Sequence, residues 1–365
     1  MNVISIIILV FFILGAIDRL FNNRFGIGEE FEKGFSLFAP MALSMLGMLV
    51  IAPAIGVWLT PLFDWFYGVF GIDPSIIPAS LFANDMGGVA LSLEINKNAA
   101  IGEFNAYIVS SMMGVTISYT LPVALSIVKK EQHKDMFLGL LSGIVTIPVG
   151  CFVSGLILGI NVLTLLLTLL PLAIFSGIIA AALIFFTSVT IKVFSVFGQV
   201  VRGVSIIGLI LAVFTFLTKI EIYEHFDSFE NAAFICANAT VTLAGALSLM
   251  FVVSKLLNKR LERIGNKVGL DATSALSLLT TIVSSTPTFG VMEKMNRKGV
   301  VLNSAFAVSA AFTLGGHLAF TMVYDADYIL PMIIGKLISG VLAVFVALVI
   351  YNQNNKNSEK ESTAK

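Results

Sequence analysis

Charged residues are scarce in this sequence. Only 12% of its 365 residues are Asp, Glu, Lys or Arg, where a soluble domain carries about 25%. Hydrophobic residues make up 57% of the chain, and the mean hydropathy is +0.96. This composition predicts a polytopic membrane protein and leaves no segment for a soluble catalytic domain.

Cysteine and histidine are also rare. Cys151 and Cys236 both fall inside apolar runs, and the three histidines, His133, His225 and His317, lie far apart. This distribution excludes a disulfide framework and argues against a metal or haem site. We therefore expect no cofactor and no enzymatic activity. The formal net charge of zero gives no basic field for nucleic acid.

Long apolar runs predict the fold class, an all-α integral membrane protein with about nine transmembrane helices. The first run lacks a basic start and a small-residue cleavage site, so we interpret it as a retained span rather than a signal peptide. The nine runs cover residues 3–21, 35–59, 104–128, 136–158, 162–187, 203–218, 232–254, 300–323 and 329–350.

Two further apolar stretches, 75–95 and 272–292, are interrupted at mid-length. Residues 84–88 supply a carboxylate and two glycines, and residues 284–288 supply hydroxyls and a proline. Backbone groups freed at bilayer depth need partners inside the protein, so neither stretch suits a lipid-facing helix. We expect two re-entrant hairpins, although full spans stay open as an alternative.

The distribution of basic residues predicts the topology. Nineteen of the 22 basic residues can be assigned to cytoplasmic segments, and the loops near 221–230 and 325–327 are then acidic and external. This assignment puts the N-terminus outside and the C-terminus in the cytoplasm. The two hairpins would enter the membrane from opposite faces.

An internal repeat agrees with that topology. An offset of 198 residues pairs Asp73 with Asp271 and Asn105 with Asn303. Inverted repeats with interrupted helices are typical of secondary transporters. The expected division is an N-terminal transmembrane helix (1–30), a first repeat (31–228), a second repeat (229–350) and a polar C-terminal tail (351–365).

Asp85 is the leading candidate for a binding residue, because an ionised carboxylate at bilayer depth is costly unless it has a function or a partner. Its neighbours Asn84, Gly87 and Gly88 would let the backbone bend and expose carbonyl groups to a small organic cation. The alternative is that Asp85 only caps a half-helix.

The second hairpin offers uncharged groups. Ser284, Ser285 and Thr286 could bind a solute hydroxyl, or could satisfy the interrupted backbone. His317 could relay protons or form a structural hydrogen bond. Lys336 lies about seven residues inside the last span. It could pair with a buried group such as Asp85, or could tie two helices together.

Six longer runs of sequence carry a family resemblance: residues 85–88, 111–116, 121–125, 143–151, 303–312 and 335–340. In these runs the chain resembles the ethanolamine-utilisation permease family, EutH, and the resemblance covers about residues 31–345. It implies a bacterial cytoplasmic-membrane permease that brings in ethanolamine for breakdown by an ammonia-lyase pathway in microcompartments.

The sequence also departs from that family. Ser284 and Ser285 stand where family members carry an Asn pair, and Gly316 stands where an acidic residue often precedes the histidine. The second departure would leave more of the ammonium binding to Asp85. A protonated amine crosses lipid poorly, so uptake through a protein would matter most at low pH.

Several alternatives stay open. Facilitated diffusion and ion coupling fit the sequence equally well, and so does ion-coupled transport of another small polar or cationic solute. A membrane enzyme acting on lipid head groups would need a nucleophile or metal cluster, and a scaffold could use the basic residues of 255–267. A homo-oligomer is also open.

Overall fold

The computed structural model describes residues 3–363, and no β-strand occurs in that part of the chain. Eight of its helical stretches are long and apolar enough to cross a membrane. This agrees with an all-α integral membrane protein. The eight stretches are Val3–Leu20, Ile27–Phe70, Ala99–Ile127, Lys130–Ile157, Val162–Phe185, Thr187–Thr218, Phe229–Lys267 and Ala326–Asn354.

The first half of the chain consists of the following elements, with η marking 3₁₀ or π-helical turns: α1 (Val3–Leu20), α2 (Ile27–Ser36), α3 (Phe38–Met41), η1 (Ala42–Leu46), α4 (Gly47–Phe70), α5 (Ile76–Leu81), η2 (Asn84–Met86), α6 (Gly88–Ile95), α7 (Ala99–Phe104), η3 (Asn105–Gly114), η4 (Thr116–Thr120), α8 (Leu121–Ile127), η5 (Lys130–Gln132), α9 (His133–Ile144) and α10 (Ile147–Ile157).

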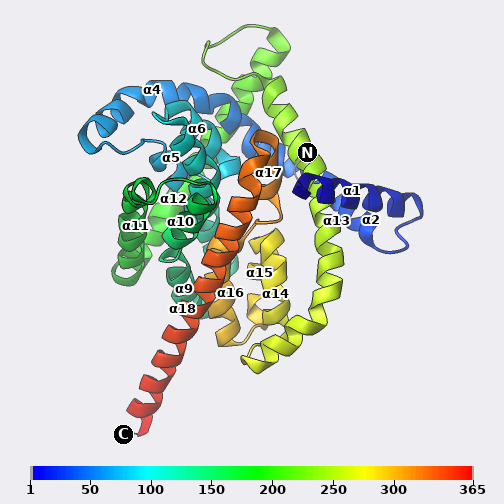
Figure 1. The fold of residues 1–365 in the computed structure, drawn as a ribbon, viewed down its shortest axis with the longest axis vertical. Helices are drawn as coiled ribbons and strands as arrows, with labels where there is room; N and C mark the ends of the chain where they lie inside the picture. The colour runs from blue at the N-terminus through cyan, green and yellow to red at the C-terminus, as the bar shows by residue number, and fades with distance from the viewer. Residues whose placement is uncertain (1–2, 364–365) are drawn as a thin grey trace.

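The second half consists of α11 (Val162–Phe185), α12 (Thr187–Thr218), α13 (Phe229–Lys267), α14 (Ala272–Val283), α15 (Ser285–Gly290), η6 (Met292–Lys294), α16 (Arg297–Ala310), α17 (Gly316–Tyr324), η7 (Ala326–Tyr328) and α18 (Ile329–Thr363). The tail expected from residue 351 continues α18, and residues 364–365 lie outside the described part. Figure 1 shows α14, α15 and α16 between α13 and α18, with α5 and α6 close to α4.

Both interrupted stretches are helical hairpins with a break at the expected residues. In the first, α5 packs against α6 through the turn at η2, and in the second, α14 packs against α15 across Ser284. Gly87 has φ +98°, and a Cβ at Gly88 would lie 2.4 Å from the carbonyl oxygen of Phe82. Both glycines are therefore needed for the tight first turn.

One of the nine expected spans, 300–323, is not a single helix. It is divided into α16 and α17 by the turn at 311–315. The backbone N–H of Phe312 donates to the carbonyl of Thr281, and that of Leu314 donates to the carbonyl of Ile282. The second hairpin thus supplies partners for the interrupted backbone, which an apolar run read alone does not reveal.

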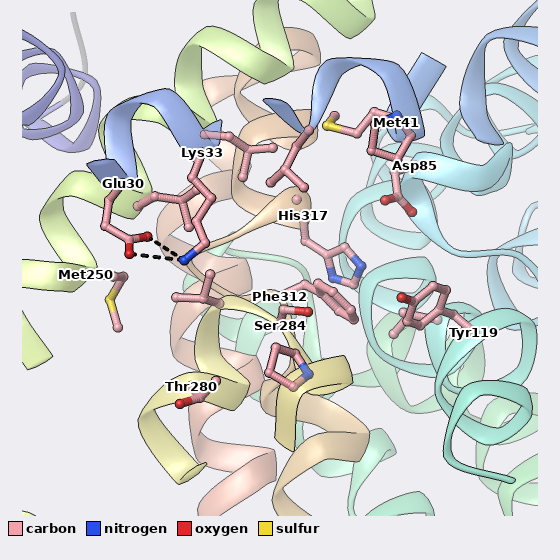
Figure 2. Close-up of a pocket in the computed structure, with 18 of the residues that line it drawn as sticks. Glu30, Lys33, Met41, Asp85, Tyr119, Met250, Thr280, Ser284, Phe312 and His317 are labelled. Atoms are coloured by element: carbon pink, nitrogen blue, oxygen red, sulfur yellow. Dashed lines mark hydrogen bonds and ion pairs between the residues drawn. The ribbon is translucent and has the colours of Figure 1, made fainter. Parts of the chain in front are cut away.

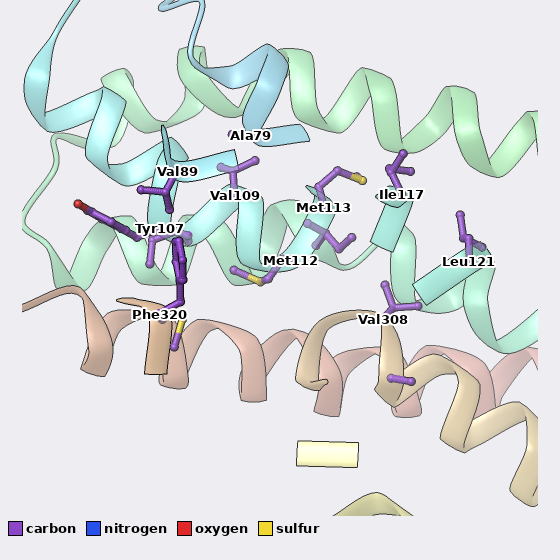
Figure 3. Close-up of a cluster of buried hydrophobic side chains, with 14 of the residues drawn as sticks. Ala79, Val89, Tyr107, Val109, Met112, Met113, Ile117, Leu121, Val308 and Phe320 are labelled. Carbon is purple, nitrogen blue, oxygen red and sulfur yellow. The ribbon is translucent and has the colours of Figure 1, made fainter. Parts of the chain in front are cut away.

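Among the eight candidate spans, the most buried is the continuous helical stretch from α7 through η3 and η4 to α8. It contains two π-helical stretches where the sequence predicted a regular helix. Its side chains form a core with residues of the first hairpin, α16 and α17, as Figure 3 shows for Val89, Met112, Val308 and Phe320. This core holds both hairpins against the centre of the molecule.

Candidate functional site

A cavity of about 700 Å³ lies between the two hairpin turns and the break before α17. Its inner end is lined by Asp85 of η2, Ser284 between α14 and α15, and His317 of α17. Figure 2 shows the Asp85 carboxylate pointing toward the space between the His317 ring and the Tyr119 hydroxyl. The structure therefore brings the three interrupted segments together at one site.

Asp85 is positioned by its neighbour. The backbone N–H of Asp85 donates to Oδ1 of the fully buried Asn84 at 2.9 Å, and Asn84 Nδ2 lies 3.5 Å from the hydroxyl of Thr321. A Cβ at Gly316 would lie 3.6 Å from Asp85 Oδ2. Among the side chains that the structure describes, those of residues 3–354, none of the ion pairs within 4.0 Å involves Asp85. Its carboxylate faces the cavity without a direct ion pair, although Lys336 attracts it electrostatically.

Lys336 is fully buried, but its partner differs from the one expected. Its Nζ donates to the backbone carbonyl of Ser111 and lies 3.1 Å from His317 Nδ1. The expected direct pair with Asp85 is not formed. His317, which is 1% exposed, contacts Lys336 and also lines the cavity.

The residues of the second hairpin divide into two groups. Of the three expected hydroxyl residues, only Ser284 lines the cavity. Ser285 is buried, and its Oγ has no hydrogen-bond partner in the structure. The hydroxyl of Thr286 lies 2.9 Å from that of Tyr119. Ser285 and Thr286 therefore do not line the cavity, and Thr286 is linked to it only through Tyr119.

Gly87 and Gly88 do not line the cavity. A Cβ at Gly87 would lie 2.5 Å from the Met48 side chain, so both glycines shape the turn that presents Asp85. The sequence-based interpretation missed Tyr119 and Phe312. Tyr119 pairs with His317 at the same 198-residue offset as the repeat, and that pairing could have identified it. Phe312, with φ +62°, depends on the unexpected break.

The outer end of the cavity is more polar. Glu30 and Lys33 of α2 line it and form an ion pair at 3.1 Å, next to Ser254 of α13. The middle of the cavity is walled by apolar side chains of α13, such as Leu243 and Leu247. Among the described residues, no group of three His, Cys, Asp or Glu side chains could hold a metal ion.

Comparison with known proteins agrees with this arrangement. Residues 1–350 match the family described as ethanolamine utilisation protein, EutH. A "probable ethanolamine permease EutH" of Listeria monocytogenes is 39% identical over 364 residues, covering the whole chain and 98% of the relative. The Salmonella typhimurium protein of the same name is 32% identical, with 96% and 95% covered.

A Bacillus subtilis protein, YxeR, is 34% identical over 363 residues, covering the whole chain and 98% of that relative. No solved structure matches the chain. The family match spans nearly the full length of the chain, and eight helical stretches are long and apolar enough to cross a membrane. The chain therefore belongs to the EutH family and is a multi-pass bacterial membrane transporter rather than an enzyme.

Proposed function

We propose that the cavity binds protonated ethanolamine and that the protein carries it across the bacterial cytoplasmic membrane. The observation that carries this proposal is the Asp85 carboxylate, which faces the cavity and forms no direct ion pair with a described side chain. An unpaired carboxylate in a partly buried site favours a cationic solute, because the ammonium group replaces the water that the carboxylate would otherwise need.

The other end of the solute meets uncharged groups. Ser284 and Tyr119 line the same cavity as Asp85, and their hydroxyls can hydrogen-bond the solute hydroxyl. The Phe312 ring lies between His317 and Tyr119, at centroid distances of 5.2 and 5.4 Å, and offers an aromatic face to the ammonium group. A cavity of about 700 Å³ far exceeds a two-carbon solute, so these polar groups must provide the selectivity.

Replacing Asp85 by Asn tests the proposal. Binding of radiolabelled ethanolamine to the purified protein should weaken roughly tenfold to a hundredfold, the usual size of a charge-assisted hydrogen bond. Saturable uptake at low pH should fall in parallel. The control is Glu30→Gln at the outer end, where the carboxylate is already paired with Lys33. Undiminished ethanolamine binding by a folded Asp85→Asn protein would refute the site.

For transport, the site must open to each side in turn, and we infer that an inverted repeat provides the two openings. One line of support is a matched set of hydrogen bonds. Asp73 Oδ2 accepts from the backbone N–H of Asn98 at 2.8 Å, and Asp271 Oδ2 accepts from that of Asn296 at 2.7 Å. Each aspartate thus ties the start of a hairpin to its end, at positions 198 residues apart.

Packing between the halves adds a second line of support. Gly47 of α4 meets the backbone of α12 at Ser205, and Gly245 of α13 meets the backbone of α1 at Ile8. Positions 47 and 245 are again 198 apart, as are the last residues of α1 and α12. At this offset α12 corresponds to α1 and α13 to α4, so the contact of α4 with α12 is equivalent to that of α13 with α1, as a pseudo-twofold arrangement requires.

The two hairpins nevertheless differ in their surroundings. The second hairpin borders the large cavity, whereas the first packs with α4 and α12 around an apolar cavity of about 230 Å³. We propose that the opposite transport state opens beside the first hairpin. Under the positive-inside rule the basic segments would face the cytoplasm. The end of the large cavity at Lys33 would then open to the cytoplasmic side.

The main alternative is secondary transport, in which the movement of ethanolamine or of another small cationic solute is coupled to an ion gradient. Uptake into proteoliposomes with and without imposed proton or sodium gradients separates it from facilitated diffusion. Accumulation above the external concentration only with a gradient identifies coupled transport. Equilibration that is independent of any gradient identifies a passive permease.

A further inference from the structure

We propose that Lys336 makes the site selective for solutes with a single positive charge, so that amino alcohols are accepted and diamines rejected. This inference rests on the proposed function, because it assumes that an ammonium group binds at Asp85. Lys336 acts through His317 and through its charge, and is therefore a positioning and selectivity residue rather than one that touches the solute.

The first step is the placement of the charge. Lys336 lies on α18 with 0% exposure, and its Nζ contacts only acceptors, the Ser111 carbonyl and His317 Nδ1. None of the ion pairs within 4.0 Å among the described residues involves Lys336. No carboxylate pairs with this ammonium directly, but it attracts Asp85 electrostatically, so its field reaches the cavity that Asp85 lines.

The second step is the orientation of His317. An ammonium group has no lone pair and can only donate, so His317 Nδ1 accepts and the neutral ring carries its proton on Nε2. The ring also packs against Phe312 with centroids 5.2 Å apart. Its orientation is thus held from two sides, with Lys336 directly behind the ring that lines the cavity.

These two features give the site an electrostatic asymmetry. Asp85 supplies one negative charge, while the Lys336 ammonium lies behind His317. The oxygen of a solute hydroxyl can accept a hydrogen bond from the hydroxyl of Ser284 or Tyr119. A second ammonium could not accept any hydrogen bond and would be repelled by Lys336.

Competition against labelled ethanolamine tests the inference. At acidic pH, doubly protonated 1,2-diaminoethane should bind wild-type protein at least about tenfold more weakly than ethanolamine, equivalent to ~1.4 kcal/mol. Lys336→Met should reduce that ratio toward one, chiefly by improved diamine binding, whereas Lys336→Arg should preserve it. The matched control is Lys33→Met, which removes a cation from the exposed end of the same cavity.

A gain of diamine binding is a result that simple loss of packing does not produce. Should Lys336→Met fail to fold, wild-type protein still decides the matter, because N-(2-aminoethyl)acetamide keeps one charge and should compete better than the diamine. Equal competition by ethanolamine, the diamine and its acetylated form would overturn the selectivity role alone. Absence of any saturable ethanolamine binding would instead overturn the proposed function as well.

Discussion

At the scale of single residues, the buried polar side chains carry the site. Asp85, His317 and Lys336 lie on three different segments, yet each is held by a backbone or side-chain hydrogen bond close to the same cavity. Burying such groups is unfavourable unless their partners are in place. Their geometry is therefore as dependent on the surrounding fold as on their own identity.

Gly88 provides a residue-scale prediction. A Cβ at this position would lie 2.4 Å from the Phe82 carbonyl oxygen and 2.7 Å from that of Ala83, so the turn of the first hairpin must shift. Gly88→Ala should lower the melting temperature in detergent, with a cost of about 1–3 kcal/mol, and weaken ethanolamine binding. Gly68→Ala is the control, because no atom lies within 4 Å of the added Cβ. Equal behaviour of both variants would contradict the expectation.

At the scale of elements, Asp73 and Asp271 each tie the start of a hairpin to its end. Besides Asn296, Asp271 accepts from the Ser274 backbone N–H at 2.9 Å and from its hydroxyl at 2.7 Å. Burial raises the pKa of the Asp271 carboxyl, but the bonds from Asn296 and Ser274 outweigh burial and hold the pKa below its ordinary value of 3.8.

Asp271→Asn should therefore destabilise the protein in a pH-dependent way. The lowered pKa means that the carboxylate contributes its full stability above about pH 4, and that this contribution is lost as pH falls through the folded-state value. We expect a loss of about 1–3 kcal/mol at neutral pH, measured by detergent melts across pH. The difference from wild type should shrink in acid.

A surface carboxylate serves as the comparison for that measurement. Asp64 is half-exposed and pairs with Lys97, so Asp64→Asn should change stability by less than about 1 kcal/mol. A loss for Asp271→Asn that stays constant from neutral pH to strong acid would show that the carboxylate charge is not the source of the effect.

At the scale of the whole molecule, the two hairpins occupy equivalent positions in the proposed repeat but have different surroundings. During transport, we expect the solvent accessibility of one hairpin to rise while that of the other falls. Both native cysteines are fully buried and can be replaced by alanine. Cysteines are then introduced at Thr280 beside the large cavity and at its repeat partner Phe82. In this state, the cysteine at Thr280 should react quickly with a water-soluble thiol reagent and the one at Phe82 slowly.

During ethanolamine transport in proteoliposomes, labelling at Thr280 should fall while labelling at Phe82 rises. A cysteine at Phe70, which is exposed at the end of α4, should be labelled equally with and without ethanolamine. Labelling that changes in the same direction at Thr280 and Phe82 would exclude alternation between the two hairpins.

Some of this architecture was predictable from local sequence. Apolar runs are sufficient to locate most spans, because the bilayer core demands about 20 apolar residues per helix. The hairpin breaks at 84–88 and 284–288 were predictable as well, since glycine, proline and a carboxylate disrupt a lipid-facing helix wherever they occur. The break between α16 and α17 was not, because its freed N–H groups are satisfied by Thr281 and Ile282 of another segment.

The sequence by itself thus determined that the chain is a membrane protein, that two of its helical stretches are interrupted at 84–88 and 284–288, and that Asp85 lies at one of these interruptions. Only the tertiary structure decided that Lys336 binds Ser111 and His317 instead of Asp85, and that Tyr119 and Phe312 complete the cavity. The physical reason is the distance along the chain over which each effect acts. Hydropathy and backbone strain act within one segment, whereas a buried charge bonds with whichever partner the packing of distant segments brings within hydrogen-bonding distance.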